Sequence, residues 1–81
     1  MLKVNVYIKH INGKTEYRNV YCSGATTVKE LFQRVSIPTS GAIVFIEGRN
    51  ITDPKARLGS LHVPNPCFVS VRYKLSGKDK F

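Results

Sequence analysis

Apolar and polar residues alternate near both ends of the chain. From Leu2 to Ile8 every second residue is apolar, which is the two-residue period of a strand with one buried face. The segment Cys67–Leu75 has the same period, with Cys67, Val69, Val71 and Tyr73 on one side. We therefore predict a half-buried strand at each end of a compact domain.

The Asn12-Gly13 pair follows the first strand directly and predicts a tight hairpin. Both residues tolerate the positive φ of a type I′ turn, the turn that matches the twist of the flanking strands. The second strand is then expected over Lys14–Cys22, with Val20 and Cys22 facing the core. The outward-facing residues of this strand are Tyr17, Asn19 and Tyr21.

One amphipathic helix is predicted in the middle of the chain. Thr27 has glutamate three residues later, which is the capping-box pattern of a helix N-terminus. The apolar stripe that follows has the i, i+3, i+4, i+7 spacing of a helix and consists of Val28, Leu31, Phe32 and Val35. We expect a helix over 28–35 that Pro38 ends, because a proline cannot continue the hydrogen-bond ladder.

A short apolar strand is expected over Ala42–Glu47, between two glycines. A very short strand at Arg49–Ile51 and a single helical turn near Leu58–Val63 follow it. The order of elements predicts an α+β fold, with a mixed sheet of four to five strands and one main helix packed on one face. In this arrangement the last strand runs parallel to the first.

Several short sequence segments, in this order and spacing, resemble the ubiquitin-like (β-grasp) family over nearly the full length of the chain. They are Ile37-Pro38, the strand and turn 44–49, the helical turn 58–63 and the final strand 69–73. The resemblance implies that the first strand is central, between the second and the last. Cys22 and Cys67 would then lie about 9.5 Å apart across two strand spacings, too far for a disulfide, and we expect two buried thiols.

The 81 residues fit a single domain over 1–75 with a flexible tail at 76–81. Thirteen Lys and Arg against five Asp and Glu give a net charge of +8, which favours anionic partners. No segment approaches the roughly 20 apolar residues of a membrane span. We expect an intracellular monomer, cytoplasmic or nuclear, that does not associate with a membrane.

The sequence predicts no catalytic, metal or cofactor site. His10 and His62 have no cysteine or carboxylate at a recognisable ligand spacing, and the five carboxylates are scattered. The resemblance implies conjugation through a C-terminal Gly-Gly, but Gly77 stands alone here and charged residues follow it. We therefore expect a non-conjugating protein without enzymatic activity.

The resemblance implies a partner-binding surface on the sheet face opposite the helix, and it points to Lys9, Phe45 and either Ser70 or Val71. Strand alternation predicts that this outer face also carries several aromatic and basic residues, namely Tyr7, Tyr17, Tyr21, Phe68, Lys3, Arg49, Arg72 and Lys74. Exposed aromatic clusters on small proteins mark interaction sites. The predicted partner-binding residues are Lys3, Tyr7, Lys9, Phe45, Arg49, Phe68, Ser70 and Arg72.

Aromatic anchors with a basic rim favour docking to an acidic protein surface. The same composition also suits single-stranded nucleic acid, which stacks its bases on aromatic rings while cations contact the phosphates. A ubiquitin-like modifier and a Ras-type GTPase-binding domain are further alternatives. For the latter, Lys14, Arg18 and Lys29 on the second strand and the helix would be the contact residues.

Overall fold

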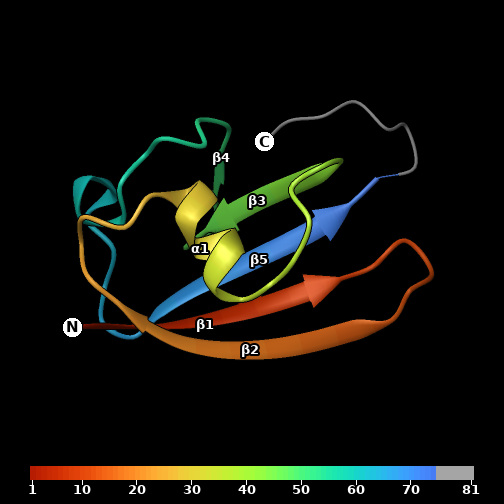
Figure 1. Ribbon diagram of the computed structural model, residues 1–81, viewed down its shortest axis with the longest axis horizontal. Coiled ribbons are helices and arrows are strands. Elements are labelled where there is room, and N and C mark those ends of the chain that lie inside the picture. Colours follow the sequence, from red (N-terminus) through yellow and green to blue (C-terminus); the bar gives the residue numbers. More distant parts are fainter. Residues whose placement is uncertain (75–81) are drawn as a thin grey trace.

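A computed structural model describes residues 1–74, so the predicted tail at 76–81 lies outside the described residues. The elements follow the predicted order (Figure 1). They are β1 (Leu2–Lys9), β2 (Thr15–Cys22), α1 (Val28–Arg34), β3 (Ala42–Ile46), β4 (Arg49–Ile51), the 3₁₀ turn η1 (Leu58–Leu61) and β5 (Cys67–Tyr73). No helix within residues 1–74 is long and apolar enough to cross a membrane.

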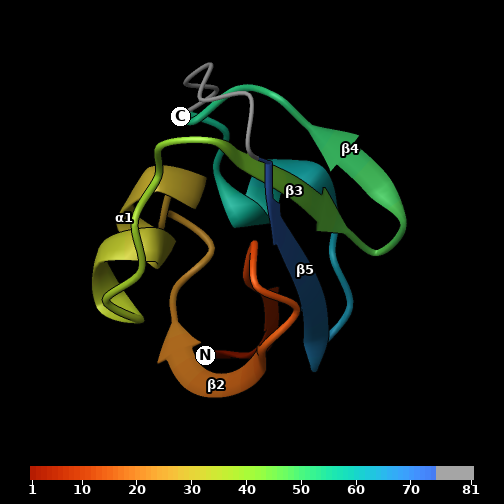
Figure 2. The same ribbon diagram turned by 90° about the vertical axis from the view of Figure 1, so that its right-hand side faces the viewer.

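The five strands form one mixed sheet in the order β2-β1-β5-β3-β4. Strand β1 is antiparallel to β2 and parallel to β5, and β3 is antiparallel to both β5 and β4. The helix α1 packs on one side of this sheet, as the view in Figure 2 shows. The predicted α+β architecture and the central position of β1 are therefore confirmed.

The core lies between α1 and the inner face of the sheet. The predicted helical stripe is buried throughout, and Phe32 is its largest member, with 1% of its surface exposed. The inward residues of the three central strands complete the core and are Val4, Val6, Ile8, Val69, Val71, Ala42, Val44 and Ile46. Since a domain of this size buries only about 60% of its unfolded surface, this single cluster provides most of the hydrophobic stabilisation.

The N-terminus of α1 has the predicted capping box. The Thr27 hydroxyl accepts a hydrogen bond of 3.1 Å from the Glu30 amide, and the Glu30 carboxylate accepts one of 2.9 Å from the Thr27 amide. These two bonds also hold the pKa of Glu30 below its usual value. Two amide groups that the first helical turn would otherwise leave unpaired are satisfied in this way.

The helix α1 ends at Arg34, one residue before the predicted end, and Pro38 is not what terminates it. Ser36 adopts the left-handed region with φ 59° and donates to the Gln33 carbonyl. The next amide, that of Ile37, donates to the Phe32 carbonyl. This pair of bonds is a Schellman motif built on a serine, so backbone hydrogen bonds end the helix before the proline is reached.

The prediction of a type I′ turn at Asn12-Gly13 was wrong, because of these two residues only Gly13 has a positive φ, at 87°. The hairpin instead uses a five-residue loop, residues 10–14, in which His10 donates to the Lys14 carbonyl and Gly13 donates to the His10 carbonyl. A turn followed by a left-handed glycine is the usual form of such longer hairpins. A two-residue turn with positive φ at both positions lies elsewhere, at Glu47-Gly48 between β3 and β4.

Both cysteines are free and buried, as predicted. Cys22 lies opposite Leu2 and Cys67 lies opposite Val4, so β1 separates the two thiols. Burial, followed by the charges of Glu47 and Cys22, raises the pKa of the Cys67 thiol to about 11. Burial also raises the pKa of Cys22. Neither thiol is therefore suited to act as a nucleophile at neutral pH.

We predict that Thr27→Ala lowers the free energy of unfolding by about 1 kcal/mol, because it removes one half of the capping box. Urea denaturation followed by circular dichroism measures this difference. Thr52→Ala is the matched control, since Thr52 is an exposed threonine outside the helices and strands. Equal unfolding midpoints for the two variants would contradict the role of the cap.

We further predict that iodoacetamide at about pH 8 alkylates both cysteines far more slowly in the folded protein than in the unfolded chain, because only exposed thiolates react. Mass spectrometry of samples quenched over time, with and without urea, measures the two rates. Alkylation of the folded protein at the rate of the unfolded chain would show that the thiols are accessible.

Candidate functional site

The outer face of the sheet, opposite α1, carries a row of side chains that crosses four strands. Tyr17 of β2 lies opposite Tyr7 of β1, Tyr7 lies opposite Ser70 of β5, and Ser70 lies opposite Phe45 of β3. Phe68 lies on the same face, two residues before Ser70 on β5. Residues from four separate segments of the sequence therefore meet on one surface.

A shallow hollow of about 440 Å³ lies among these side chains and is lined mainly by aromatic rings. Tyr17 is 70% exposed and Phe68 is 58% exposed, whereas Tyr7 and Phe45 are more covered. The rings of Tyr7 and Tyr17 meet edge to face, with their centroids 5.0 Å apart. We call Tyr7, Tyr17, Phe45, Phe68 and Ser70 the aromatic patch. Contiguous apolar surface of this kind is unusual on a small monomer unless it contacts a partner.

Basic residues flank the aromatic patch at both ends. Lys9 and Arg72 lie opposite each other on β1 and β5, one row beyond Ser70. Lys3 lies near the other end of β1, opposite Tyr21 of β2. One acidic residue, Glu47, lines the hollow, and its carboxylate accepts a 2.8 Å hydrogen bond from the Phe68 amide. The charge that surrounds the patch is therefore predominantly positive.

Seven of the eight predicted site residues lie on this face, and Arg49 does not. Arg49 lies opposite Ile46, whose side chain is in the core, and its guanidinium donates to the Leu61 carbonyl. Strand alternation misplaced it because the two-residue turn between β3 and β4 returns its side chain to the inner side. Of the two residues that the resemblance offered on β5, Ser70 is on the outer face, while Val71 is fully buried. Lys74 lies one residue beyond β5.

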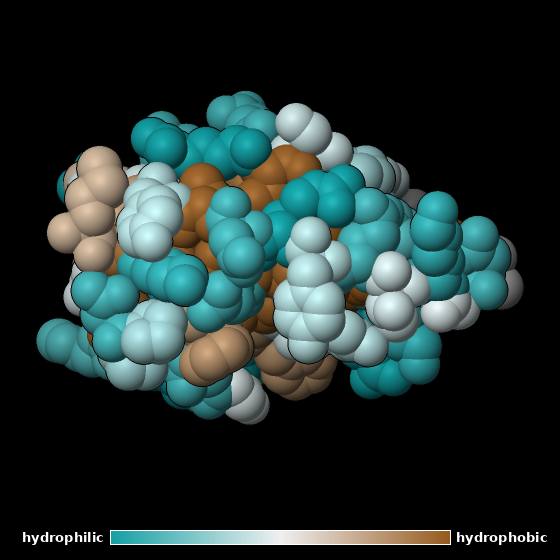
Figure 3. Space-filling model, turned by 90° about the horizontal axis from the view of Figure 1, so that it is seen from below, coloured by the Kyte–Doolittle hydropathy of each residue, from teal (hydrophilic) through white to brown (hydrophobic). Residues whose placement is uncertain are grey.

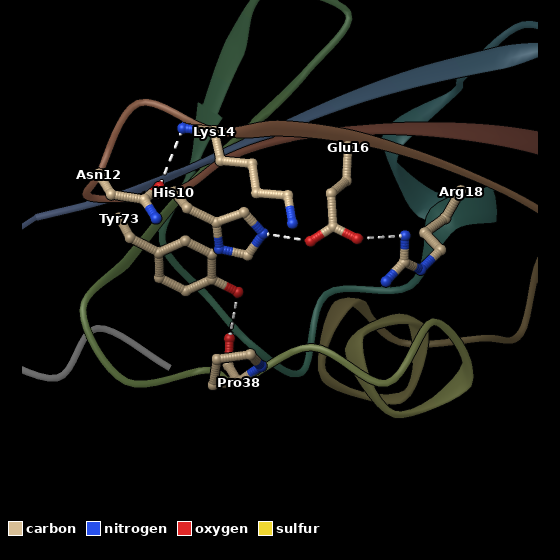
Figure 4. A network of polar contacts seen from close by, with 7 residues as sticks. All are labelled: His10, Asn12, Lys14, Glu16, Arg18, Pro38 and Tyr73. Carbon is tan, nitrogen blue, oxygen red and sulfur yellow. Dashed lines mark hydrogen bonds and ion pairs between the residues drawn. The ribbon is translucent and has the colours of Figure 1, made fainter.

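A second polar cluster lies on the inner side, where the β1–β2 hairpin extends past the helix (Figure 4). His10 Nε2 lies 2.5 Å from one Glu16 oxygen, and Arg18 Nη1 lies 2.7 Å from the other. The hydrogen bond from Arg18, and then the one with His10, lowers the pKa of Glu16. The prediction that His10 lacks a partner was therefore wrong, since its partner comes from the opposite strand of the hairpin.

Tyr73 joins this cluster to the rest of the domain. The His10 ring stacks parallel to the Tyr73 ring with centroids 5.7 Å apart, and the Tyr73 hydroxyl donates to the Pro38 carbonyl at 2.5 Å. Burial raises the pKa of Tyr73 to about 12. These contacts connect the hairpin, β5 and the loop before β3. They have a structural role, because His10 Nε2, both Glu16 oxygens and the Tyr73 hydroxyl each have a partner within the molecule.

The part of the chain that the structure describes holds no group of three His, Cys, Asp or Glu side chains placed to bind a metal. The aromatic patch itself contains no paired acid and base and no nucleophile with an adjacent base. The patch and the residues that flank it present aromatic rings and cations.

Comparison with known proteins supports the fold. No protein-family model and no curated protein sequence matches the chain. Among solved structures, a designed protein based on ubiquitin is similar, with a TM-score of 0.58 and 19% identity over 93% of each chain. The solution structure of a ubiquitin-like domain from an Arabidopsis thaliana protein has a TM-score of 0.62 and 18% identity, over 91% of this chain and 80% of that one. The chain therefore has the ubiquitin-like β-grasp fold, and its structural neighbours are ubiquitin-like domains.

Proposed function

We propose that the protein is a non-catalytic, non-conjugating interaction module that binds an acidic protein surface through the aromatic patch. The observation that supports this most directly is the exposed aromatic hollow in the middle of the outer face. Burying exposed rings in a partner's pockets is the usual source of binding energy at protein interfaces. The ubiquitin-like fold suggests the same general role.

The charge around the patch supports an acidic partner. Lys3, Lys9 and Arg72 flank the rings, and the whole chain has a net charge of +8. Rim charges of this kind accelerate the encounter with an oppositely charged partner more than they strengthen the final complex. The association rate of the complex should therefore fall with salt, while the aromatic contacts retain much of the affinity.

Single-stranded nucleic acid is the second candidate, because strongly exposed rings beside cations could also stack bases and contact phosphates. Phe68 and Tyr17 are the most exposed rings of the patch, and Lys9 and Arg72 lie one row away. We rank this ligand second, because the sequence contains none of the familiar nucleic-acid-binding motifs.

We predict that Phe68→Ala combined with Arg72→Glu abolishes retention of partner proteins in affinity purification from cell extract. Each substitution removes one component of the surface, the ring and the rim charge, without touching the core. Ile11→Ser is the matched control, because Ile11 is an exposed apolar residue on the hairpin that does not line the aromatic hollow. If the wild type and the double variant retained the same proteins, binding through the patch would be refuted.

We also predict that a short single-stranded oligonucleotide produces no localised ¹H–¹⁵N chemical-shift changes around Tyr7, Phe45 and Arg72 at physiological salt. Diffuse shifts at low salt that disappear at about 0.15 M would reflect only the net positive charge. Localised shifts that persist at this salt concentration would show that nucleic acid, and not an acidic protein, is the ligand of the patch.

A further inference from the structure

Strand β2 is a long edge strand, and no other strand within residues 1–74 pairs with its outer side. The sheet order makes β2 and β4 the two edges, and β2 has eight residues where β4 has three. In Figure 1, β2 runs along the bottom of the sheet with no other element beyond it. An unpaired edge of this length presents a row of free backbone donors and acceptors to any chain that can align with it.

The register identifies which backbone groups face outward. His10 donates to the Lys14 carbonyl at 2.8 Å, and this pair continues the β1–β2 register, in which Lys9 lies opposite Thr15. Hydrogen-bonded pairs alternate along an antiparallel ladder, so the even-numbered residues of β2 bond to β1. Arg34 of α1 reaches the Tyr21 carbonyl from outside the sheet, which agrees with this assignment. The outward-directed groups are those of Thr15, Tyr17 and Asn19, together with Tyr21.

Three of the usual devices that protect an edge, namely a proline, a lysine and a bulge, are missing from β2, although the strand has two inward-pointing charged residues. The strand contains no proline and no lysine, and its pairing with β1 runs from Cys22 to Thr15 without a bulge. Its two charged residues, Glu16 and Arg18, bond to each other on the inner side. On the outer side it exposes Tyr17 and Tyr21, which are 70% and 58% exposed. Figure 3 looks onto this edge from below and shows apolar side chains between the polar ones.

We propose that β2 pairs with β2 of a second copy of this chain, antiparallel and about a twofold axis through Tyr17. In this register the outward-directed backbone groups of Tyr17 meet those of its counterpart, and those of Thr15 meet those of Asn19. Both pairings are hydrogen-bonded pairs of an antiparallel ladder. Two copies would thereby join their sheets into one continuous sheet.

Charge complementarity favours a second copy as the partner in this register. With the axis at Tyr17, Glu16 of each copy lies opposite Arg18 of the other, and such opposite-charge pairs stabilise a ladder. An axis at Arg18 would place two arginines directly opposite each other. An axis at Asn19 would need the Tyr21 carbonyl, which already accepts from Arg34. The seam is locally neutral although each chain has a charge of +8. This assembly departs from the monomer that the composition alone led us to expect.

The aromatic patch stays exposed in this assembly. Tyr7 and Tyr17 lie on the outer face, so each copy contributes its pair of rings to one surface that crosses the seam. A partner that contacts both patches would bind more tightly than one that contacts a single patch, because its second contact is intramolecular. The self-pairing rests on the edge strand and is independent of the proposed partner, because Phe68 and Arg72 are both on β5.

Sedimentation velocity on the 81-residue chain, from about 10 μM to about 1 mM, tests the self-pairing, because this range detects dimers with free energies of association of about −4 to −7 kcal/mol. We expect reversible dimers. Glu16→Arg should weaken dimerisation roughly tenfold, because two attractive pairs become repulsive. The exchange Glu16→Arg with Arg18→Glu should restore dimerisation, since it re-creates the same pairs in the opposite order. A monomer at every concentration, or a dimer that Glu16→Arg does not weaken, overturns the proposal.

Two further measurements keep the test independent of folding defects. Tyr17→Pro should give a folded monomer, because the Tyr17 amide points away from β1, whereas Val20→Pro removes an amide of the β1–β2 ladder and should unfold the hairpin. In a mixture of differently labelled chains, an intermolecular nuclear Overhauser effect between the α-protons of Glu16 and Arg18 should appear. If instead the chain stays monomeric and a poly-glutamate peptide shifts the β2 amides, the edge binds an acidic strand and the self-pairing is wrong.

Discussion

The parallel ladder between β1 and β5 joins segments from the two ends of the domain in the middle of the sheet, and the rest of the structure depends on it. It places Val6 beside Val69 in the core and Tyr7 beside Ser70 on the outer face. Parallel strands need a crossover between them, and here that connection includes α1, which covers the inner face. Since neither strand can bury its inner face alone, the core and the outer surface form together.

The consequence for function is a surface assembled from distant parts of the sequence. The aromatic patch takes residues from β1, β2, β3 and β5, and a slip of one residue in any of these strands would turn its patch residue inward. The register is held by the buried alternation, because β1, β3 and β5 have their buried apolar residues on the inner face. The same constraint leaves β2 as an edge, so the exposed rings of Tyr17 and Tyr21 lie beside backbone groups that have no partner within the sheet.

At the helix ends and in the hairpin loop, local sequence signals predict some features of the structure and miss others. The capping box at Thr27 depends on residues three apart, and the sequence predicted it correctly. The end of α1 depends on a left-handed serine, a conformation with no strong signature at this residue type. The Asn12-Gly13 pair is compatible with two hairpin turns, and the strand register selects the longer one. His10 and Glu16 meet only because that hairpin aligns them.

The sequence by itself determined the elements, the buried alternation and the ubiquitin-like order of strands, because these depend on local period, caps and spacing. Seven of its eight predicted site residues lie on the outer face, since alternation in a strand assigns each side chain to one side. Only the tertiary structure decided the side of Arg49 and the ion pairs of Glu16. The physical reason is that turns and cross-strand contacts set these positions, and both depend on which strands become neighbours.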